Sequence, residues 1–388
     1  CLNVCPAFRL VGGHVYGGSI YTGGIGTLLT SFLNSRERGK DIQNICLQCG
    51  TCNTVCGGKL DIAGMILKLR TKFAQEDGLN PVHKFCLDTV ADRHLFHSML
   101  RIASVAQGMI TKGQPMIRHL PSIAPQPFRD ILPTIKQDVP NPKGKIAIFT
   151  GCLLDFVYVD IATDVVKALN MAGYIVEMPL GQACCGAPAT YMGDVENAKK
   201  AAELNLNAME AEKYDYIVSA CPTCTHALRD YVDFFKDDPE MLKKAEELRS
   251  KTFDFCKLVS MLGGLPDTGD GVPMKVTYHD SCHLNRYLGV TKEQRELLKA
   301  TKGVELIEMH DCDKCCGFGG SYSVKFPEMS APILEEKINN IVASGADVVA
   351  VDCPGCLLQI RGGLDARGLN NIQVKHTAQI VVEKREKK

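Results

Sequence analysis

The chain has 388 residues, and 45% of them are hydrophobic, which is enough for packed cores and excludes a wholly disordered protein. Its 44 Lys and Arg residues balance its 44 Asp and Glu residues, so a dedicated nucleic-acid binder is not expected. No run of 18 uncharged apolar residues predicts a membrane-spanning helix. The nineteen cysteines are the outlier, because seventeen of them fall in short groups or in phase with such groups. This pattern indicates thiolate metal chemistry in a reducing compartment rather than disulfides.

Residues 1–112 are expected to form a small, mainly helical iron–sulfur domain. The run 12–26 holds seven glycines and predicts irregular backbone. Apolar residues recur with helical periodicity over 61–76, with Asp61 as the cap, and residues 81–110 also read as helix.

The cysteines of this domain follow the spacing of bacterial ferredoxins. Cys46, Cys49, Cys52 and Cys56 form one complete run, whereas Cys1 and Cys5-Pro6 end a second run whose first two cysteines we expect before residue 1. The fourth cysteine of such a run ligates the other cluster in two-cluster ferredoxins. The spacing therefore predicts one cubane 4Fe-4S cluster on Cys5, Cys46, Cys49 and Cys52, and places Cys1 and Cys56 in a second, incomplete one. A zinc ribbon is the competing interpretation.

Residues 113–144 hold seven of the eighteen prolines and are expected to form a semi-rigid, largely extended linker. After it, short β-branched runs alternate with amphipathic helices, which predicts an α/β fold with mainly parallel sheets. We expect strands near 145–152, 174–180, 214–221, 274–282, 304–310 and 346–353, and helices at 160–173, 194–213, 291–303 and 327–345. Two units follow from this order, 145–270 and 271–388.

The two units are an internal repeat, as the spacing of their cysteines shows. Cys152 and Cys282 are 130 residues apart, the Cys-Cys-Gly motifs at 184 and 315 are 131 apart, and the Cys-Pro-x-Cys motifs at 221 and 353 are 132 apart. Because ligands bind at the carboxyl ends of parallel strands, we expect the cysteines of each repeat to gather at one site, giving two separate sites. Each site is expected to be a soft-metal centre, with zinc as the alternative to an iron–sulfur cluster.

Several neighbouring residues need separate interpretations. Gly186 and Gly317 are expected to let the backbone approach a bulky cluster. His279 and His283 flank Cys282. They either tune a cluster through hydrogen bonds to sulfur, relay protons, or are structural residues of the turn and the strand end. Cys86 and Cys256 are expected to be buried structural thiols and His14 to be structural. Cys312 is expected to be incidental, with a role as a ligand or redox neighbour as the alternative.

The motifs CCGFGGSYSVKFPEMS and GADVVAVDCPGCLLQI resemble the cysteine-rich CCG domains of heterodisulfide reductases and of the glycolate oxidase iron–sulfur subunit, and more closely the lactate utilisation protein A family. The segments CLNVCPAFRLVGGHVYGGSIYTGGIGTLLT and CLQCGTCNTVCGGKLDI resemble the ferredoxin end of lactate utilisation protein B. The resemblance implies a noncubane 4Fe-4S cluster in each repeat. Its ligands would be Cys152, Cys184, Cys185, Cys221 and Cys224 in the first, and Cys282, Cys315, Cys316, Cys353 and Cys356 in the second.

The resemblance further implies a cytoplasmic electron-transfer subunit of a lactate- or 2-hydroxy-acid-oxidising dehydrogenase. Its expected partners are a flavin-containing dehydrogenase subunit and other lactate-utilisation subunits, with peripheral membrane association through a partner left open. No nucleotide-binding fingerprint follows a strand, so a flavin or nicotinamide is expected on another chain. The alternatives that stay open are a catalytic subunit cleaving a disulfide, as in the heterodisulfide reductase relatives, and a zinc-stabilised interaction module.

Overall fold

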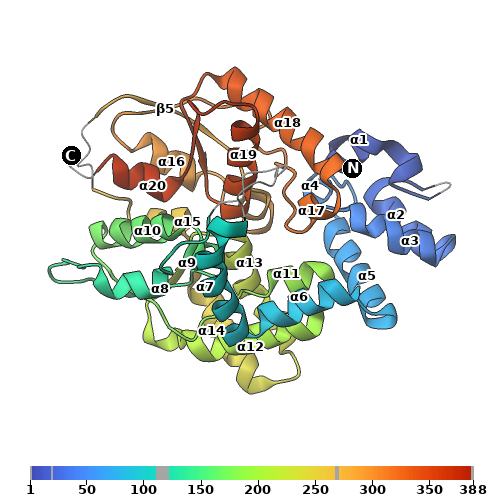
Figure 1. Cartoon of the computed structure of the whole chain (residues 1–388), viewed down its shortest axis with the longest axis horizontal. Coiled ribbons are helices and arrows are strands. Elements are labelled where there is room, and N and C mark those ends of the chain that lie inside the picture. The colour runs from blue at the N-terminus through green and yellow to red at the C-terminus, as the bar shows by residue number, and fades with distance from the viewer. Residues whose placement is uncertain (1, 19–20, 111–121, 267–270, 386–388) are drawn as a thin grey trace.

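The computed structural model describes residues 2–18, 21–110, 122–266 and 271–385. Its N-terminal part, drawn in blue to cyan in Figure 1, is built from helices. Asp61 caps the long helix α5 by accepting a hydrogen bond from the Gly64 amide, as the sequence predicts. The elements are η1 (Leu2–Val4), α1 (Pro6–Val15), α2 (Gly23–Leu33), α3 (Arg36–Ile42), η2 (Gln43–Ile45), α4 (Thr51–Thr54), α5 (Ile62–Asp77), α6 (Pro81–Ala91) and α7 (Arg93–Ile110).

The glycine-rich run is less irregular than predicted. Helix α1 continues to Val15 but is kinked at Gly12, whose φ of +67° and ψ of −173° are not helical, and α2 starts at Gly23. The run is therefore irregular at Gly12, as predicted, and helical on either side of its middle. Residues 19–20 lie outside the described ranges. Helix forms over the rest of these ends because glycine costs a helix only about 1 kcal/mol per residue, which tertiary packing can offset.

The proline-rich segment is not an extended spacer over its described part, which begins at residue 122. It contains α8 (Phe128–Ile131) and η3 (Leu132–Thr134), and the Phe128 and Leu132 side chains are buried in the core of the first repeat. The Ala124 amide also donates to the Phe156 carbonyl at 2.7 Å. Two apolar side chains that can be buried therefore outweigh the extended preference of the prolines. Residues 113–121 of the predicted linker lie outside the described ranges.

A buried ion pair fastens this segment. The Arg129 guanidinium pairs with the Asp155 carboxylate, and the two side chains are 10% and 0% exposed. We predict that Arg129→Ala lowers the free energy of unfolding by about 3–5 kcal/mol, because it leaves the buried Asp155 carboxylate without its counter-charge and, within the described part of the chain, with only the backbone amide of residue 129 as a donor. The control is Arg101→Ala, whose pair with Asp130 is exposed and contributes less than about 1 kcal/mol. Denaturant unfolding of both variants measures the difference, and equal losses would contradict the prediction.

The first repeat is a parallel sheet in the order β2-β1-β3-β4. Its strands are β1 (Lys145–Ile148), β2 (Ile175–Glu177), β3 (Tyr216–Ser219) and β4 (Thr252–Asp254). Its helical elements are α9 (Leu153–Phe156), α10 (Val159–Met171), α11 (Ala187–Met192), α12 (Val195–Met209), η4 (Ala211–Lys213), α13 (Pro222–Asp230), η5 (Tyr231–Phe234), α14 (Pro239–Lys251) and α15 (Phe255–Met261).

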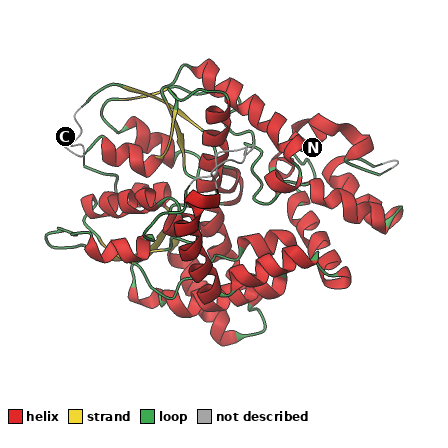
Figure 2. Cartoon of the chain, viewed as in Figure 1, coloured by secondary structure: helices red, strands yellow, loops and turns green. Residues whose placement is uncertain are grey.

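The second repeat copies this topology in the order β6-β5-β7-β8, again with all strands parallel. Figure 2 shows the short strands of both sheets surrounded by helices. The strands are β5 (Met274–Tyr278), β6 (Val304–Leu306), β7 (Val348–Val351) and β8 (Gln373–His376). The helical elements are η6 (His283–Tyr287, a π-helical turn), α16 (Glu293–Lys299), α17 (Tyr322–Lys325), α18 (Pro327–Ser344), α19 (Pro354–Ala366) and α20 (Thr377–Glu383).

The two repeats pack together reciprocally. Helix α10 of the first repeat contacts α20 of the second, and α16, the counterpart of α10, contacts α15, the counterpart of α20. Such reciprocal contacts are the signature of a two-fold relation. One apolar core runs through both repeats, with Val165 and Leu169 in the first and Val381 and Val382 in the second.

The N-terminal helices lie against both repeats (Figure 1). Helices α5 and α6 contact α11 and α12 of the first repeat, and α1 contacts α18 of the second. This arrangement brings the ferredoxin-spaced cysteines next to the sheet ends. Among the described helices, none combines the length and apolar character needed to span a bilayer.

Candidate metal centre

The topology of each sheet brings its cysteines to one edge. In the first repeat the chain leaves β1 toward β2 on one side and leaves β3 toward β4 on the other. Cys152 and Cys221 follow β1 and β3, so they flank the point where the strand order reverses, which is where open α/β sheets bind ligands. Cys282 and Cys353 take the equivalent places after β5 and β7.

The Cys-Pro-x-Cys motifs begin helices. Cys221 is the N-cap of α13 and Cys353 the N-cap of α19, each followed by a proline in the first turn. Proline suits this position because its missing amide would have no helical partner there. The partial positive charge of a helix N-terminus favours thiolate over thiol.

The glycines of the Cys-Cys-Gly motifs serve a different contact from the one predicted. Gly186 and Gly317 have φ of +78° and +83°, and a Cβ at either position would approach a helix rather than a cysteine cavity. The nearest atoms are the Ala198 carbonyl oxygen of α12, at 3.2 Å, and the Ser330 carbonyl oxygen of α18, at 2.8 Å. These glycines therefore allow a left-handed turn tight against the following helix.

Within each repeat the thiols lie side by side. In the second repeat the Cys316 and Cys356 sulfurs are 3.4 Å apart, and Cys315 contacts Cys282 and Cys316. In the first repeat, hydrogen bonds from Cys184 and Cys224 lower the pKa of Cys185 to about 6. The two sets that the structure brings together are those that the sequence predicts: Cys152, Cys184, Cys185, Cys221 and Cys224, and Cys282, Cys315, Cys316, Cys353 and Cys356.

The two sets open into one shared cavity, and the expectation of two separate metal sites stays a prediction. The Cys221 thiol of the first repeat lies within hydrogen-bonding reach of the Cys353 thiol of the second. All ten cysteines, together with Cys46 of the N-terminal part, line one cavity of about 500 Å³. Spacing along the chain could not reveal this, because it depends on how the two repeats pack.

The four cysteines predicted to hold a cubane are also neighbours. Burial and the nearby thiols of Cys46, Cys49 and Cys52 raise the pKa of Cys5 to about 12. The backbone amide of Gln48 points at the Cys46 sulfur at 3.4 Å, an orientation that requires an unusual φ of +58°. Such N–H to sulfur contacts are among the features that tune iron–sulfur clusters.

Cys56 lies at the edge of this group. It packs beside Cys46 and Cys52 in the α2–α5 apolar cluster, and its sulfur accepts a hydrogen bond from the Leu60 amide at 3.4 Å. Cys1, its predicted partner in a second cluster, lies outside the described residues. The second cubane therefore stays a prediction.

Direct contacts connect the N-terminal set to the second repeat. The Cys49 and Cys315 thiols are close enough for each charge to affect the other. The Tyr287 hydroxyl donates to the Gln48 carbonyl at 2.9 Å, and Arg286 donates to the Cys49 carbonyl at 3.3 Å. Both residues follow Cys282 on the π-helical turn η6, a kind of turn that is frequent at functional sites.

The charges around the cavity suit an anionic group. Every cysteine in the described ranges carries a free thiol. The Lys337 ammonium is buried at 1% exposure and donates to the backbone carbonyls of Asp311 and Cys312, and Arg70 donates to carbonyl and amide oxygens beside Cys46. Neither cation pairs with a carboxylate among the described residues. A buried cation needs a counter-charge, and iron–sulfur clusters held by thiolates provide negative charge.

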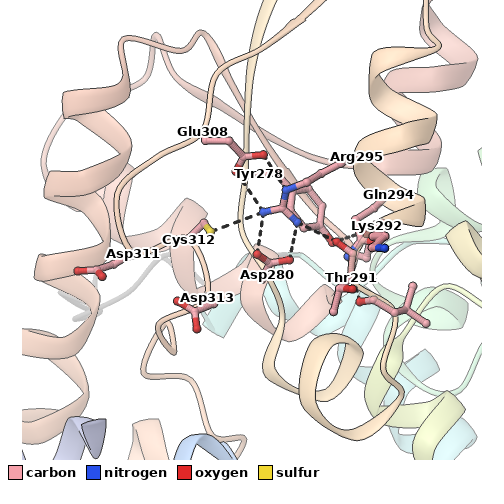
Figure 3. Close-up of polar contacts among 12 residues, drawn as sticks. Tyr278, Asp280, Thr291, Lys292, Gln294, Arg295, Glu308, Asp311, Cys312 and Asp313 are labelled. Carbon is pink, nitrogen blue, oxygen red and sulfur yellow. Dashed lines mark hydrogen bonds and ion pairs between the residues drawn. The ribbon is translucent and has the colours of Figure 1, made fainter. Parts of the chain in front are cut away.

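An ion-pair network centred on Arg295 supports the loops that carry the second set of cysteines, and Figure 3 shows its contacts. Arg295 of α16 donates to both carboxylate oxygens of Asp280, at 2.9 and 2.7 Å, and to Glu308 at 2.6 Å. The Asp280 amide donates to the Cys312 carbonyl at 3.1 Å. The network thus ties the end of β5, which carries Cys282, to the loop that carries Cys315.

The remaining residues that the sequence analysis named differ in how deeply they are buried. Cys256 is buried, as expected, and its thiol reaches the Asp352 carboxylate at 3.5 Å. Cys86 was expected to be buried but is exposed on α6, where nothing among the described residues covers that helix face. Cys312 lies beside Arg295, outside the cavity lining. His14 is an exposed residue of α1.

The two histidines near Cys282 differ in their partners. His283 is held by the Tyr191 hydroxyl at 2.7 Å and faces Thr223 at 3.3 Å. His279 is 1% exposed, and burial lowers its pKa to about 3. Neither of its ring nitrogens has a hydrogen-bond partner among the described residues.

Comparison with known proteins identifies the repeats. The cysteine-rich domain family (CCG) matches residues 146–229 and 276–361. The chain is 39% identical to lactate utilization protein A of Shouchella clausii over 240 residues, which cover 62% of this chain and 99% of that protein. It is 37% and 36% identical to the proteins of that name from Bacillus velezensis and Bacillus subtilis, over 61% of this chain and 98% of each relative.

One solved structure also aligns. It is a hypothetical protein from Helicobacter pylori, with a TM-score of 0.47 and 10% identity, covering 95% of this chain and 77% of that one. A likeness of this degree does not establish a shared fold.

Proposed function

The chain belongs to the lactate utilization protein A family, and from this membership we propose that it is the iron–sulfur subunit of a lactate-oxidising system, passing electrons singly between clusters. A 2-hydroxy acid that a flavin oxidises releases two electrons together, and an iron–sulfur cluster can accept them one at a time. The chain's own residues would hold, space and electrostatically tune such clusters.

The observation that carries the proposal is the unbroken succession of three cysteine sets. Cys49 adjoins Cys315, which joins the N-terminal set to the second repeat. Cys353 adjoins Cys221, which joins the second repeat to the first. Because neighbouring sets meet thiol to thiol along these contacts, an electron entering at one end has a short path to the other.

The finer assignments belong to the same proposal. The N-terminal set would hold a cubane 4Fe-4S cluster, and each repeat a noncubane 4Fe-4S cluster, in a protein that works in the cytoplasm. The flavin would belong to a partner dehydrogenase subunit. The surface nearest the N-terminal set and the surface nearest the first repeat are the two ends of the proposed path, so we assign them to the electron donor and acceptor.

Reconstitution tests the proposal. The chain is purified anaerobically, mixed with the flavin-containing dehydrogenase of the same system and L-lactate, and followed through its iron–sulfur absorbance. One lactate oxidised to pyruvate supplies two electrons, so each should bleach two one-electron clusters. A loaded chain that lactate and the dehydrogenase leave oxidised would contradict the proposal.

A second function is supported by the shared cavity. Ten thiols around about 500 Å³ leave a place where a disulfide substrate could meet clusters from both repeats. A disulfide reductase needs two electrons and two protons for each bond that it cleaves. Turnover of a disulfide by the isolated, chemically reduced chain, together with no reduction by lactate, would favour this function over electron transfer.

A further inference from the structure

We propose that His279 supplies a nitrogen ligand to the iron–sulfur centre of the second repeat, so that the two repeats hold centres with different ligand sets. This inference rests on the proposed iron–sulfur function. It adds a non-cysteine donor to the five cysteines of the second repeat.

The first observation is geometric. A ring nitrogen of His279 and the sulfurs of Cys316 and Cys356 all lie within 4.8 Å of one another, and the two sulfurs are 3.4 Å apart. Ligands on one tetrahedral metal with bonds of about 2.0–2.3 Å lie roughly 3.4–3.8 Å apart. Only small side-chain movements would therefore bring the His279 nitrogen to the metal centre that the two thiols would hold.

The second observation is that neither ring nitrogen of His279 has a hydrogen-bond partner among the described residues. Burying an imidazole without hydrogen bonds costs free energy, and buried polar groups are nearly always satisfied. The other buried or half-buried histidines near the repeats have partners: His283 has Tyr191, His376 has the Ala378 amide and His226 has Asp230. A bound iron would supply the missing partner, since imidazole is a common ligand for iron.

The third observation is the asymmetry between the repeats. Phe149 is the counterpart of His279, since each lies three residues before the first cysteine of its repeat. Their backbones are equivalent, because the Phe149 amide donates to Val218 on β3 at 2.8 Å and the His279 amide donates to Ala350 on β7 at 3.0 Å. A phenyl ring cannot ligate a metal, so the first repeat lacks this donor.

The difference has a redox consequence. The histidine would add a neutral donor to five thiolates, so the two centres would differ in their ligand sets and therefore in their reduction potentials. The charge of the buried Lys337 side chain also interacts with the Cys315 and Cys316 thiols and favours negative charge on the second centre.

Selective ¹⁵N-histidine labelling and pulsed electron paramagnetic resonance of the full, anaerobically purified chain test this assignment. We expect a coupling to a directly bound histidine nitrogen in the native protein. It should vanish in His279→Phe, which introduces the residue that the first repeat has at this position, and in His279→Asn. Two variants are used so that the test still holds if one of them fails to fold. The control is His310→Phe, because the His310 side chain is 81% exposed and should leave the coupling unchanged. Redox titration should also show a shifted potential for the second centre in the His279 variants, and the native potential in His310→Phe.

Iron and acid-labile sulfide counts on the same samples separate the two possible failures. A loaded second repeat without a bound-nitrogen coupling, or a coupling that persists in folded His279→Phe, would overturn the inference and leave the proposed function standing. The absence of iron and sulfide from both repeats would overturn both.

Discussion

Replacing Cys185 or Cys316 by serine is expected to abolish the lactate-driven bleaching of the cluster in the repeat that carries the substitution. Each thiol stands in the middle of its set: Cys185 contacts Cys184 and Cys224, and Cys316 contacts Cys315 and Cys356. A serine hydroxyl is a hard, protonated donor and a poor substitute for the soft thiolate. Changes to residues that only support a metal ligand already cost about 10–100-fold, so loss of a ligand should slow electron transfer by at least about 100-fold.

The matched control for this experiment is Cys312→Ser. Cys312 lies on the same loop as Cys316, but its thiol faces Arg295 and lies outside the cavity lining. Stopped-flow absorbance with the partner dehydrogenase and L-lactate should show native bleaching for Cys312→Ser and the loss of one cluster's share of the bleaching for Cys185→Ser and for Cys316→Ser. If all three variants bleach at the native rate, electrons do not pass through the repeats.

Replacing Cys49 by alanine is expected to remove one cluster and leave the repeats loaded. The Cys49 side chain is buried within the N-terminal set, where its thiol contacts Thr51 at 3.4 Å. The loop itself is held through backbone carbonyls by Arg286 and Tyr287, so the side chain can be lost without freeing the loop. Iron and sulfide should each fall by about four per chain, the content of one cubane.

Cys86→Ala controls for the general loss of a thiol, because Cys86 is exposed and stands apart from every set. Its iron and sulfide content should equal that of the native chain. An unchanged iron content in Cys49→Ala would disprove the N-terminal cluster assignment, and loss of all iron would show that the three sets load together.

The repeat architecture could be predicted because its signals are local and occur twice. Three cysteine motifs in register and apolar runs such as those of β1 and β7 sufficed for the parallel sheets. Strands β4 (Thr252–Asp254) and β8 (Gln373–His376) were not predicted, since three or four residues at the edge of a sheet carry no long apolar run. The helices of the proline-rich segment were not predicted, because they depend on the packing of Phe128 against core residues that lie far away in the sequence.

The sequence predicted which cysteines lie together in each set, but not how the sets lie relative to one another. Spacing groups the cysteines of each set, whereas the contact between Cys221 and Cys353 depends on how two repeats pack. The missing partners of His279 and the buried charge of Lys337 likewise become visible only in three dimensions. A comparison of the repeats in sequence does pair His279 with Phe149, and that asymmetry is the one signal that could have singled it out.

The most direct test of the account is the metal and sulfide content of the anaerobically purified native chain. The account predicts iron and acid-labile sulfide in near-equal amounts, at about four each per cluster and hence roughly twelve each for the three cysteine sets. Stoichiometric zinc without acid-labile sulfide would contradict it and would make the chain a zinc-stabilised module instead.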